Sequence, residues 1–143
     1  MCTYGYRAPV EETPPLPEHA ALAQYRVLLV EDDPEYGRMV ERVLRCARPP
    51  LWVHREERLA AGLDRLEHEH YDALVMDLKL PDAEGRSTLA NACAQADQLP
   101  VLVLTSTDDQ ELALDAIRGG AEDYLVKQRT HALSLPGAVV RAI

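Results

Sequence analysis

The sequence lacks the features of a disulfide-rich, zinc-binding or membrane-spanning protein. Its three cysteines, Cys2, Cys46 and Cys93, are scattered and form no Cys-x-x-Cys pair, so we expect neither a disulfide framework nor a zinc site. No apolar run approaches the ~20 residues that span a bilayer, and the N-terminus has no apolar stretch typical of a signal peptide. We therefore expect a soluble, cytoplasmic protein without a membrane partner.

Basic residues are also scarce. The chain contains 15 Lys and Arg against 24 Asp and Glu, which gives a net charge of −9. This balance argues against direct nucleic-acid binding, because the phosphate backbone attracts basic patches. Metal ions and basic protein surfaces are more natural partners. The length of 143 residues and a hydrophobic content of 47% fit one compact domain.

The first 25 residues differ from the remainder of the chain. They contain four of the ten prolines, at positions 9, 14, 15 and 17, and show little apolar periodicity. We interpret residues 1–25 as a proline-rich N-terminal tail. Residues 26–143 would then form the folded domain.

After residue 25, short apolar segments alternate with segments of helical periodicity. The expected strands are Arg26–Val30, Leu51–His54, Ala73–Asp77, Pro100–Thr105 and Asp123–Val126. The first helix is expected to begin at Pro34 and to stop before the prolines at 49 and 50, and the next two are expected over Glu57–His68 and Arg86–Ala94. A fourth helix should run from Asp108 or Asp109 through Arg118, and the last from about Ala132 or Leu135 to the end. This alternation predicts an α/β fold with a doubly wound parallel sheet and helices on both faces.

Polar residues stand where the expected strands end. In a doubly wound sheet the functional crevice lies at the carboxyl ends of the strands. Each polar residue alone is more often a helix cap or a solvated turn residue, but their joint presence at one edge indicates a site. The residues are Glu31, Asp32 and Asp33 after the first strand, Asp77 after the third, Thr105 and Ser106 after the fourth, and Lys127 after the fifth.

This set of groups has a definite chemistry. Neighbouring carboxylates repel one another, and a divalent cation relieves the repulsion. Hard oxygen ligands suit Mg²⁺, and no His or Cys cluster favours zinc. An ionised carboxylate beside Mg²⁺ can attack phosphorus and form an acyl phosphate. The Lys127 ammonium and the Thr105 hydroxyl would then donate to the phosphoryl oxygens.

Four segments of the chain strongly resemble the receiver domain of bacterial two-component response regulators. They are VLLVEDDP (27–34), LVMDLKLPDAEG (74–85), PVLVLTS (100–106) and GAEDYLVK (120–127), and the resemblance covers roughly residues 26–143. It implies a flavodoxin-like sheet with strand order 2-1-3-4-5. It also implies a signalling switch that assists its own phosphorylation and dephosphorylation but is not a turnover enzyme.

The resemblance also implies roles for individual residues and partners. A histidine kinase or phosphotransfer protein would donate the phosphoryl group, and a partner or a second copy would dock on the surface formed by the helix ending at Arg118, the strand 123–126 and the last helix. Asp77 matches the phosphoacceptor of the family. The implied Mg²⁺ ligands are Asp32, Asp77 and the backbone carbonyl of Lys79, with Glu31 acting through water. Thr105 matches the switch hydroxyl, Lys127 the characteristic lysine of the family and Tyr124 the aromatic switch.

The sequence departs from the family pattern in three places. Gln128 follows Lys127 where the family commonly has a cis proline, and a cis bond without proline costs roughly 3 kcal/mol. Lys79 places a bulky cation beside Asp77. The chain also stops at Ile143 without an output domain, so it is either a piece of a larger protein or a protein that signals by binding alone.

Two alternatives remain open from the sequence. The first is a pseudo-receiver, a module that keeps the fold and binds partners without being phosphorylated. The second is a phosphatase of the haloacid-dehalogenase type, a family that carries an Asp-x-Asp motif after its first strand. Here the matching stretch reads Asp77-Leu78-Lys79, so the second acid is missing.

Overall fold

A computed structural model describes residues 25–47, 50–81, 83–84, 92–94, 98–105, 110–127 and 134–143. The expected tail over residues 1–25 lies outside the described residues except for Tyr25, which opens the first strand. Most of the helix expected over Arg86–Ala94 also lies outside them, as do Ser106 and Gln128. These expectations therefore stay predictions.

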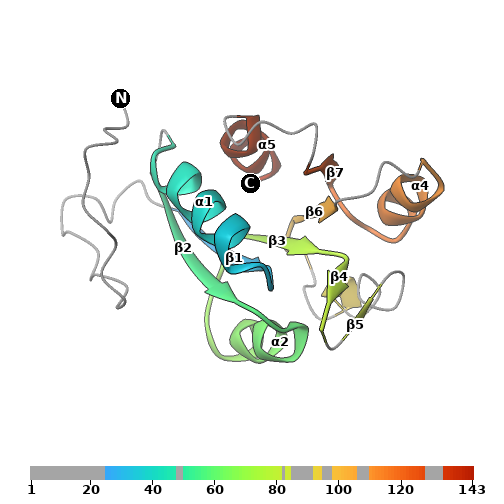
Figure 1. Ribbon diagram of the computed structural model, residues 1–143, viewed down its shortest axis with the longest axis horizontal. Helices are drawn as coiled ribbons and strands as arrows, with labels where there is room; N and C mark the ends of the chain where they lie inside the picture. The colour runs from blue at the N-terminus through green and yellow to red at the C-terminus, as the bar shows by residue number, and fades with distance from the viewer. Residues whose placement is uncertain are drawn as a thin grey trace.

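Five parallel strands form the central sheet (Figure 1). They are β1 (Tyr25–Val30), β2 (Leu51–Glu56), β3 (Ala73–Asp77), β6 (Val101–Thr105) and β7 (Asp123–Val126). Their order in the sheet is β2-β1-β3-β6-β7, and every neighbouring pair is parallel. Counted along the chain, this order is 2-1-3-4-5, which confirms the doubly wound fold expected from the sequence.

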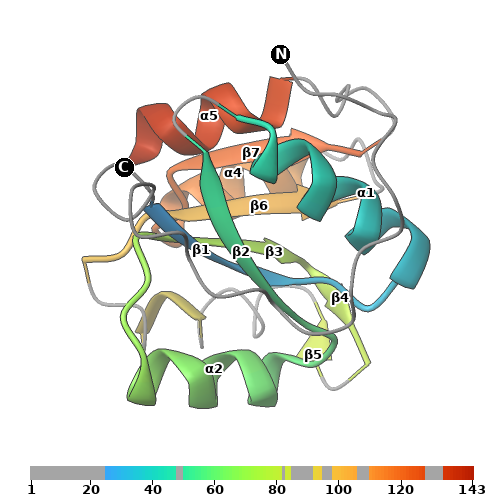
Figure 2. The same cartoon turned by 90° about the vertical axis from the view of Figure 1, so that its left-hand side faces the viewer.

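Helices cover both faces of the sheet. α1 (Pro34–Arg45) and α5 (Leu135–Ala142) lie on one face, and α2 (Leu59–His68) and α4 (Gln110–Arg118) belong to the other. Figure 2 shows α1 and α5 above the strands and α2 below them. The core accordingly forms two layers, and successive residues of one strand enter different layers: Leu28 and Val30 face α2, whereas Val27 and Leu29 face α1. Burial on both faces explains why the strands read as unbroken apolar runs.

The structure differs from the expected elements in a few places. Lys79–Leu80 (β4) and Ala83–Glu84 (β5) form a small antiparallel pair where the sequence indicated only a loop. Strands of two residues are too short to show an alternating pattern, so the sequence gave no signal for them. α2 begins at Leu59 rather than Glu57, and α5 begins at Leu135, the later of the two expected starts.

One bonded cysteine qualifies the expectation that the chain has no disulfide framework. Cys46, which follows α1, is disulfide-bonded, whereas Cys93 is a free thiol. Spacing along a sequence shows only local pairs such as Cys-x-x-Cys, so the sequence gave no signal for this bond. Disulfides are rare in the reducing cytoplasm, so the cysteine pattern no longer supports the cytoplasmic location, which stays a prediction.

The close approach of α2 to β1 generates a stability prediction. A Cβ atom added at Gly62 would lie 2.7 Å from Val30 Cγ2, and both residues are buried. Gly-to-Ala changes inside a helix usually stabilise by about 0.5–1 kcal/mol. At Gly62 we expect the opposite sign, a loss of about 1–3 kcal/mol in the free energy of unfolding, because the added methyl overpacks the core.

Gly137 in α5 provides the matched control for this substitution. A Cβ there would meet only the far end of the Arg141 side chain, at 3.1 Å, which can move aside. Urea denaturation should therefore show Gly62→Ala destabilised and Gly137→Ala unchanged or stabilised. Equal stabilisation by both changes would contradict the packing described here.

Candidate functional site

The parallel sheet brings the polar residues predicted from the sequence to one edge. Glu31 directly follows β1, Asp77 ends β3, Thr105 ends β6 and Lys127 follows β7. The strand register fixes their relative height, because Asp77 pairs with Leu104 and Thr105 pairs with Val126. The Lys127 amide also donates a hydrogen bond to the Thr105 carbonyl, with an N–O distance of 2.7 Å.

Three carboxylates form the centre of the site. Oxygens of Glu31, Asp32 and Asp77 all lie within 4.8 Å of one another. Glu31 is fully buried at 0% exposure and Asp77 is 6% exposed, while Asp32 is more open to solvent. Oxygen ligands at this spacing fit a hard divalent cation such as Mg²⁺, and the opening at Asp32 leaves room for the water ligands that Mg²⁺ retains.

The Lys127 ammonium lies between two of these carboxylates. Its Nζ atom is 2.9 Å from Asp77 Oδ2, to which it donates a hydrogen bond, and 2.6 Å from Glu31 Oε2. The contact with Glu31 is an ion pair, and both of its side chains are largely shielded from water. Within the described part of the chain, one ammonium therefore faces three carboxyl groups.

The charges at this edge shift the pKa values of the groups that carry them. Burial raises the pKa of the Glu31 carboxyl, and the Lys127 ammonium offsets this effect only in part. For Lys127, burial alone would lower the pKa, but its contacts with Glu31 and Asp77 outweigh burial and raise it. Both groups thus hold their protons more tightly than in water. A buried carboxylate that is only partly compensated is a suitable ligand for an added cation.

Asp33 has a different role from its two acidic neighbours. It lies outside the carboxylate cluster and is the N-cap of α1, where Oδ1 accepts hydrogen bonds from the amides of Glu35 and Tyr36 at 3.0 and 3.3 Å. Its own amide donates to Glu31 Oε1 at 3.1 Å. Helix capping therefore explains why an acid also stands at position 33 of the sequence, since a capping side chain accepts hydrogen bonds from amides at the helix start.

Arg55 of β2 fixes the turn that carries these acids. Its Nη1 atom donates to the Glu31 carbonyl, and its Nε atom pairs with Glu41 of α1, both at 3.3 Å. The side chain passes over Gly37, where a Cβ would lie 2.7 Å from Arg55 Cδ. No sequence pattern pointed to this arginine, because the contact joins two strands and a helix in space.

Thr105 and Tyr124 belong to the neighbouring strands β6 and β7. Thr105 is fully buried. Tyr124 pairs in register with Val103 and packs against the core layer that α2 and α4 cover. The backbone of Lys79 lies in β4, just past Asp77. The structure therefore brings Thr105 and Lys79 to the same edge as Asp77, with Tyr124 further down the neighbouring strand.

Tyr36 in the first turn of α1 is a neighbour that the sequence analysis missed. The Lys127 Nζ atom lies 4.5 Å from the centroid of its ring. Burial raises the pKa of the Tyr36 hydroxyl. In the sequence, a tyrosine in the first turn of a helix indicates no more than packing against the core. Only the fold shows that the Lys127 ammonium lies over the Tyr36 ring.

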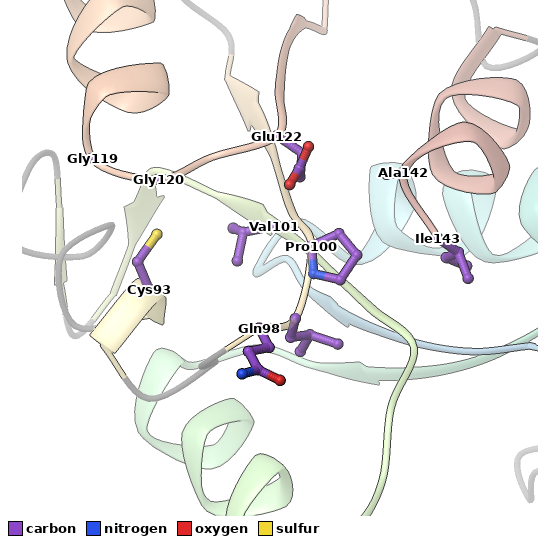
Figure 3. Close-up of a pocket in the computed structure, with 10 residues that line it drawn as sticks. Cys93, Gln98, Pro100, Val101, Gly119, Gly120, Glu122, Ala142 and Ile143 are labelled. Atoms are coloured by element: carbon purple, nitrogen blue, oxygen red, sulfur yellow. The ribbon is translucent and has the colours of Figure 1, made fainter.

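Two other features lie away from this edge. A cavity of about 450 Å³ opens at the opposite end of the sheet, where β6 and β7 begin, and is lined by residues such as Cys93, Pro100, Glu122 and Ile143 (Figure 3). A second cluster of polar side chains, Asp64, Glu67 and His68 on α2, is exposed to solvent. Neither feature includes residues that the sequence predicted.

Comparison with known proteins agrees with this geometry. Residues 27–134 match the response regulator receiver domain family. The chain is 33% identical over 102 residues to the swarming motility regulation protein RssB of Serratia marcescens, covering 71% of this chain and 45% of that protein. It is 36% identical over 103 residues to the transcriptional activator protein IrlR of Burkholderia pseudomallei, covering 71% and 43%.

The solved structures extend this comparison to the fold. The receiver domain of the Francisella response regulator 1452 superposes with a TM-score of 0.75 at 22% identity, covering 82% of this chain and 95% of that one. The matched region spans less than half the length of RssB and of IrlR. None of the described helices has both the length and the apolar character needed to cross a bilayer. The chain belongs to the response regulator receiver domain family.

Proposed function

We propose that this receiver domain is a switch that accepts a phosphoryl group on Asp77 with the help of Mg²⁺. The observation that carries the proposal is the position of Asp77 Oδ2, which lies 2.9 Å from the Lys127 ammonium and within the cluster of three carboxylates. This carboxyl group is nearly buried, and the groups around it favour an incoming dianion once a cation is bound.

The proposed donor is the phosphohistidine of a histidine kinase or phosphotransfer protein. An Asp77 oxygen attacks the phosphorus atom, and the new O–P bond forms as the P–N bond breaks. The electron pair of the broken bond stays on the imidazole, whose other nitrogen already carries a proton, so neutral histidine leaves. Lys127 and Thr105 then donate to the phosphoryl oxygens on Asp77.

Asp32, Asp77 and the backbone carbonyl of Lys79 would hold the Mg²⁺ ion, with Glu31 acting through a water molecule. The ion, when bound, would neutralise charge on the phosphoryl oxygens. Glu31 supports this assignment, because it is fully buried and belongs to the carboxylate cluster with Asp32 and Asp77. Hydrolysis of the acyl phosphate would end the signal, so we propose a self-assisting switch rather than a turnover enzyme.

The proposed output surface is formed by α4, β7 and α5. Thr105 and Tyr124 belong to neighbouring strands, so an inward movement of Thr105 toward the phosphoryl group would open space for Tyr124. Leu114 and Ile117 of α4 are 53% and 48% exposed, which suits docking of a protein partner or a second copy. We propose no direct contact with nucleic acid, since the chain has a net charge of −9.

The phosphoacceptor can be tested directly. Incubation with acetyl phosphate and Mg²⁺ should add one phosphoryl group to the wild-type protein, detected by intact mass, and none to Asp77→Asn, which lacks the nucleophilic oxygen. Removal of Mg²⁺ with a chelator should abolish the addition to the wild type. Equal labelling of both proteins would exclude Asp77 as the acceptor, and no labelling of either would favour the pseudo-receiver.

The metal ligands generate a second test. Mg²⁺ should raise the melting temperature of the wild-type protein, because it binds the folded acid cluster and relieves its repulsion. Asp32→Asn should weaken Mg²⁺ binding at least about tenfold in calorimetric titration.

Asp33→Asn is the matched control for this substitution. Asn caps a helix about as well as Asp, and Asp33 lies outside the carboxylate cluster, so this variant should bind Mg²⁺ nearly as the wild type does. Equal weakening in both variants would point to general surface charge rather than a built site.

A further inference from the structure

Tyr36 contacts the site without belonging to any motif. It lies in the first turn of α1, where the Asp33 cap binds its amide. Its ring is half-buried and packs against the core layer beneath α1 and α5. The ring is therefore held from both ends, by the capped backbone and by the core. A ring held in this way presents a fixed face to its neighbours.

That face lies under the Lys127 ammonium. The Nζ atom is 4.5 Å from the ring centroid, within the distance at which a cation is attracted to an aromatic face. The Lys127 side chain is only 14% exposed, so water screens this attraction weakly. Among the residues that the structure describes, the Lys127 ammonium thus contacts two carboxylates and one ring.

The three contacts are not equivalent during phosphoryl transfer. The Asp77 oxygens would be engaged by the phosphoryl group and the cation, and Glu31 would be drawn toward the cation. A lysine side chain has a flexible four-carbon stem, so it needs another contact to stay in place when its carboxylate partners change. The ring is the contact that neither the cation nor the phosphoryl group competes for.

We propose that Tyr36 is a positioning residue for phosphoryl transfer, whose ring face holds the Lys127 ammonium beside Asp77. The inference rests on the proposed function of Asp77 and Lys127. It differs from a packing role in one respect: packing needs only bulk, whereas this role needs an aromatic face. The hydroxyl is not required.

The test compares Tyr36→Leu with Tyr36→Phe in phosphorylation by acetyl phosphate and Mg²⁺. Tyr36→Leu keeps much of the apolar bulk but loses the ring face, so its rate should fall roughly fivefold, the size expected of a partly desolvated cation–π contact. Tyr36→Phe restores the face and should recover the rate. Equal rates for Leu and Phe would overturn the inference.

A double-mutant cycle shows whether Tyr36 acts through Lys127. If it does, Tyr36→Leu should cause no further loss of rate in a Lys127→Ala background, because the cation that it holds is gone. Independent, additive losses would contradict the inference. Tyr71→Leu is the control, since Tyr71 also covers a cation, Arg26, at 4.9 Å but precedes β3, at its other end. That variant should keep the wild-type rate.

One readout does not depend on phosphorylation. The ring should shift the NMR signals of the Lys127 ε-methylene protons upfield in the wild type and in Tyr36→Phe, but not in Tyr36→Leu. A wild-type protein without this shift would overturn the inference even if Asp77 is phosphorylated. A protein that shows the shift but is never phosphorylated would instead contradict the proposed function.

Discussion

The constraint on which the site depends is the gathering of three carboxyl groups at one edge of the sheet, with the Lys127 ammonium in contact with two of them. Two unit charges about 4 Å apart interact by about 4 kcal/mol at the effective dielectric constant of a protein surface region, so repulsion within such a cluster is large. Lys127 contacts Glu31 and Asp77 and offsets part of it. In the proposed function, the remaining negative charge would attract a cation and make the site sensitive to an added phosphoryl group.

The parallel sheet makes this arrangement possible. The inner strands β1, β3 and β6 are buried on both faces over most of their length, so their apolar residues supply the core and their polar residues stand at the ends. The order β2-β1-β3-β6-β7 places the ends of β1 and β3 side by side, which brings Glu31 next to Asp77. Asp33 and Arg55 then fix the turn after β1 through capping and through the Glu31 carbonyl.

The sequence predicted the sheet and the acids because both leave local patterns: apolar runs that end in charged residues. It could not predict contacts made only in space. The pairing of Lys127 with two carboxylates, the ring of Tyr36 beneath it and the arginine over Gly37 join distant segments. The β4–β5 pair was too short to show periodicity, and Asp33 was one of three adjacent acids whose capping role only the helix start reveals.

The most direct test of the account is a crystal structure of the protein with Mg²⁺ and beryllofluoride, which mimics a phosphoryl group on a carboxylate. The account predicts beryllofluoride bonded to Asp77, Mg²⁺ contacting Asp32 and Asp77, and the Lys127 ammonium within hydrogen-bonding distance of a fluorine atom. Beryllofluoride or Mg²⁺ bound at another part of the surface, with Lys127 directed to solvent, would contradict it.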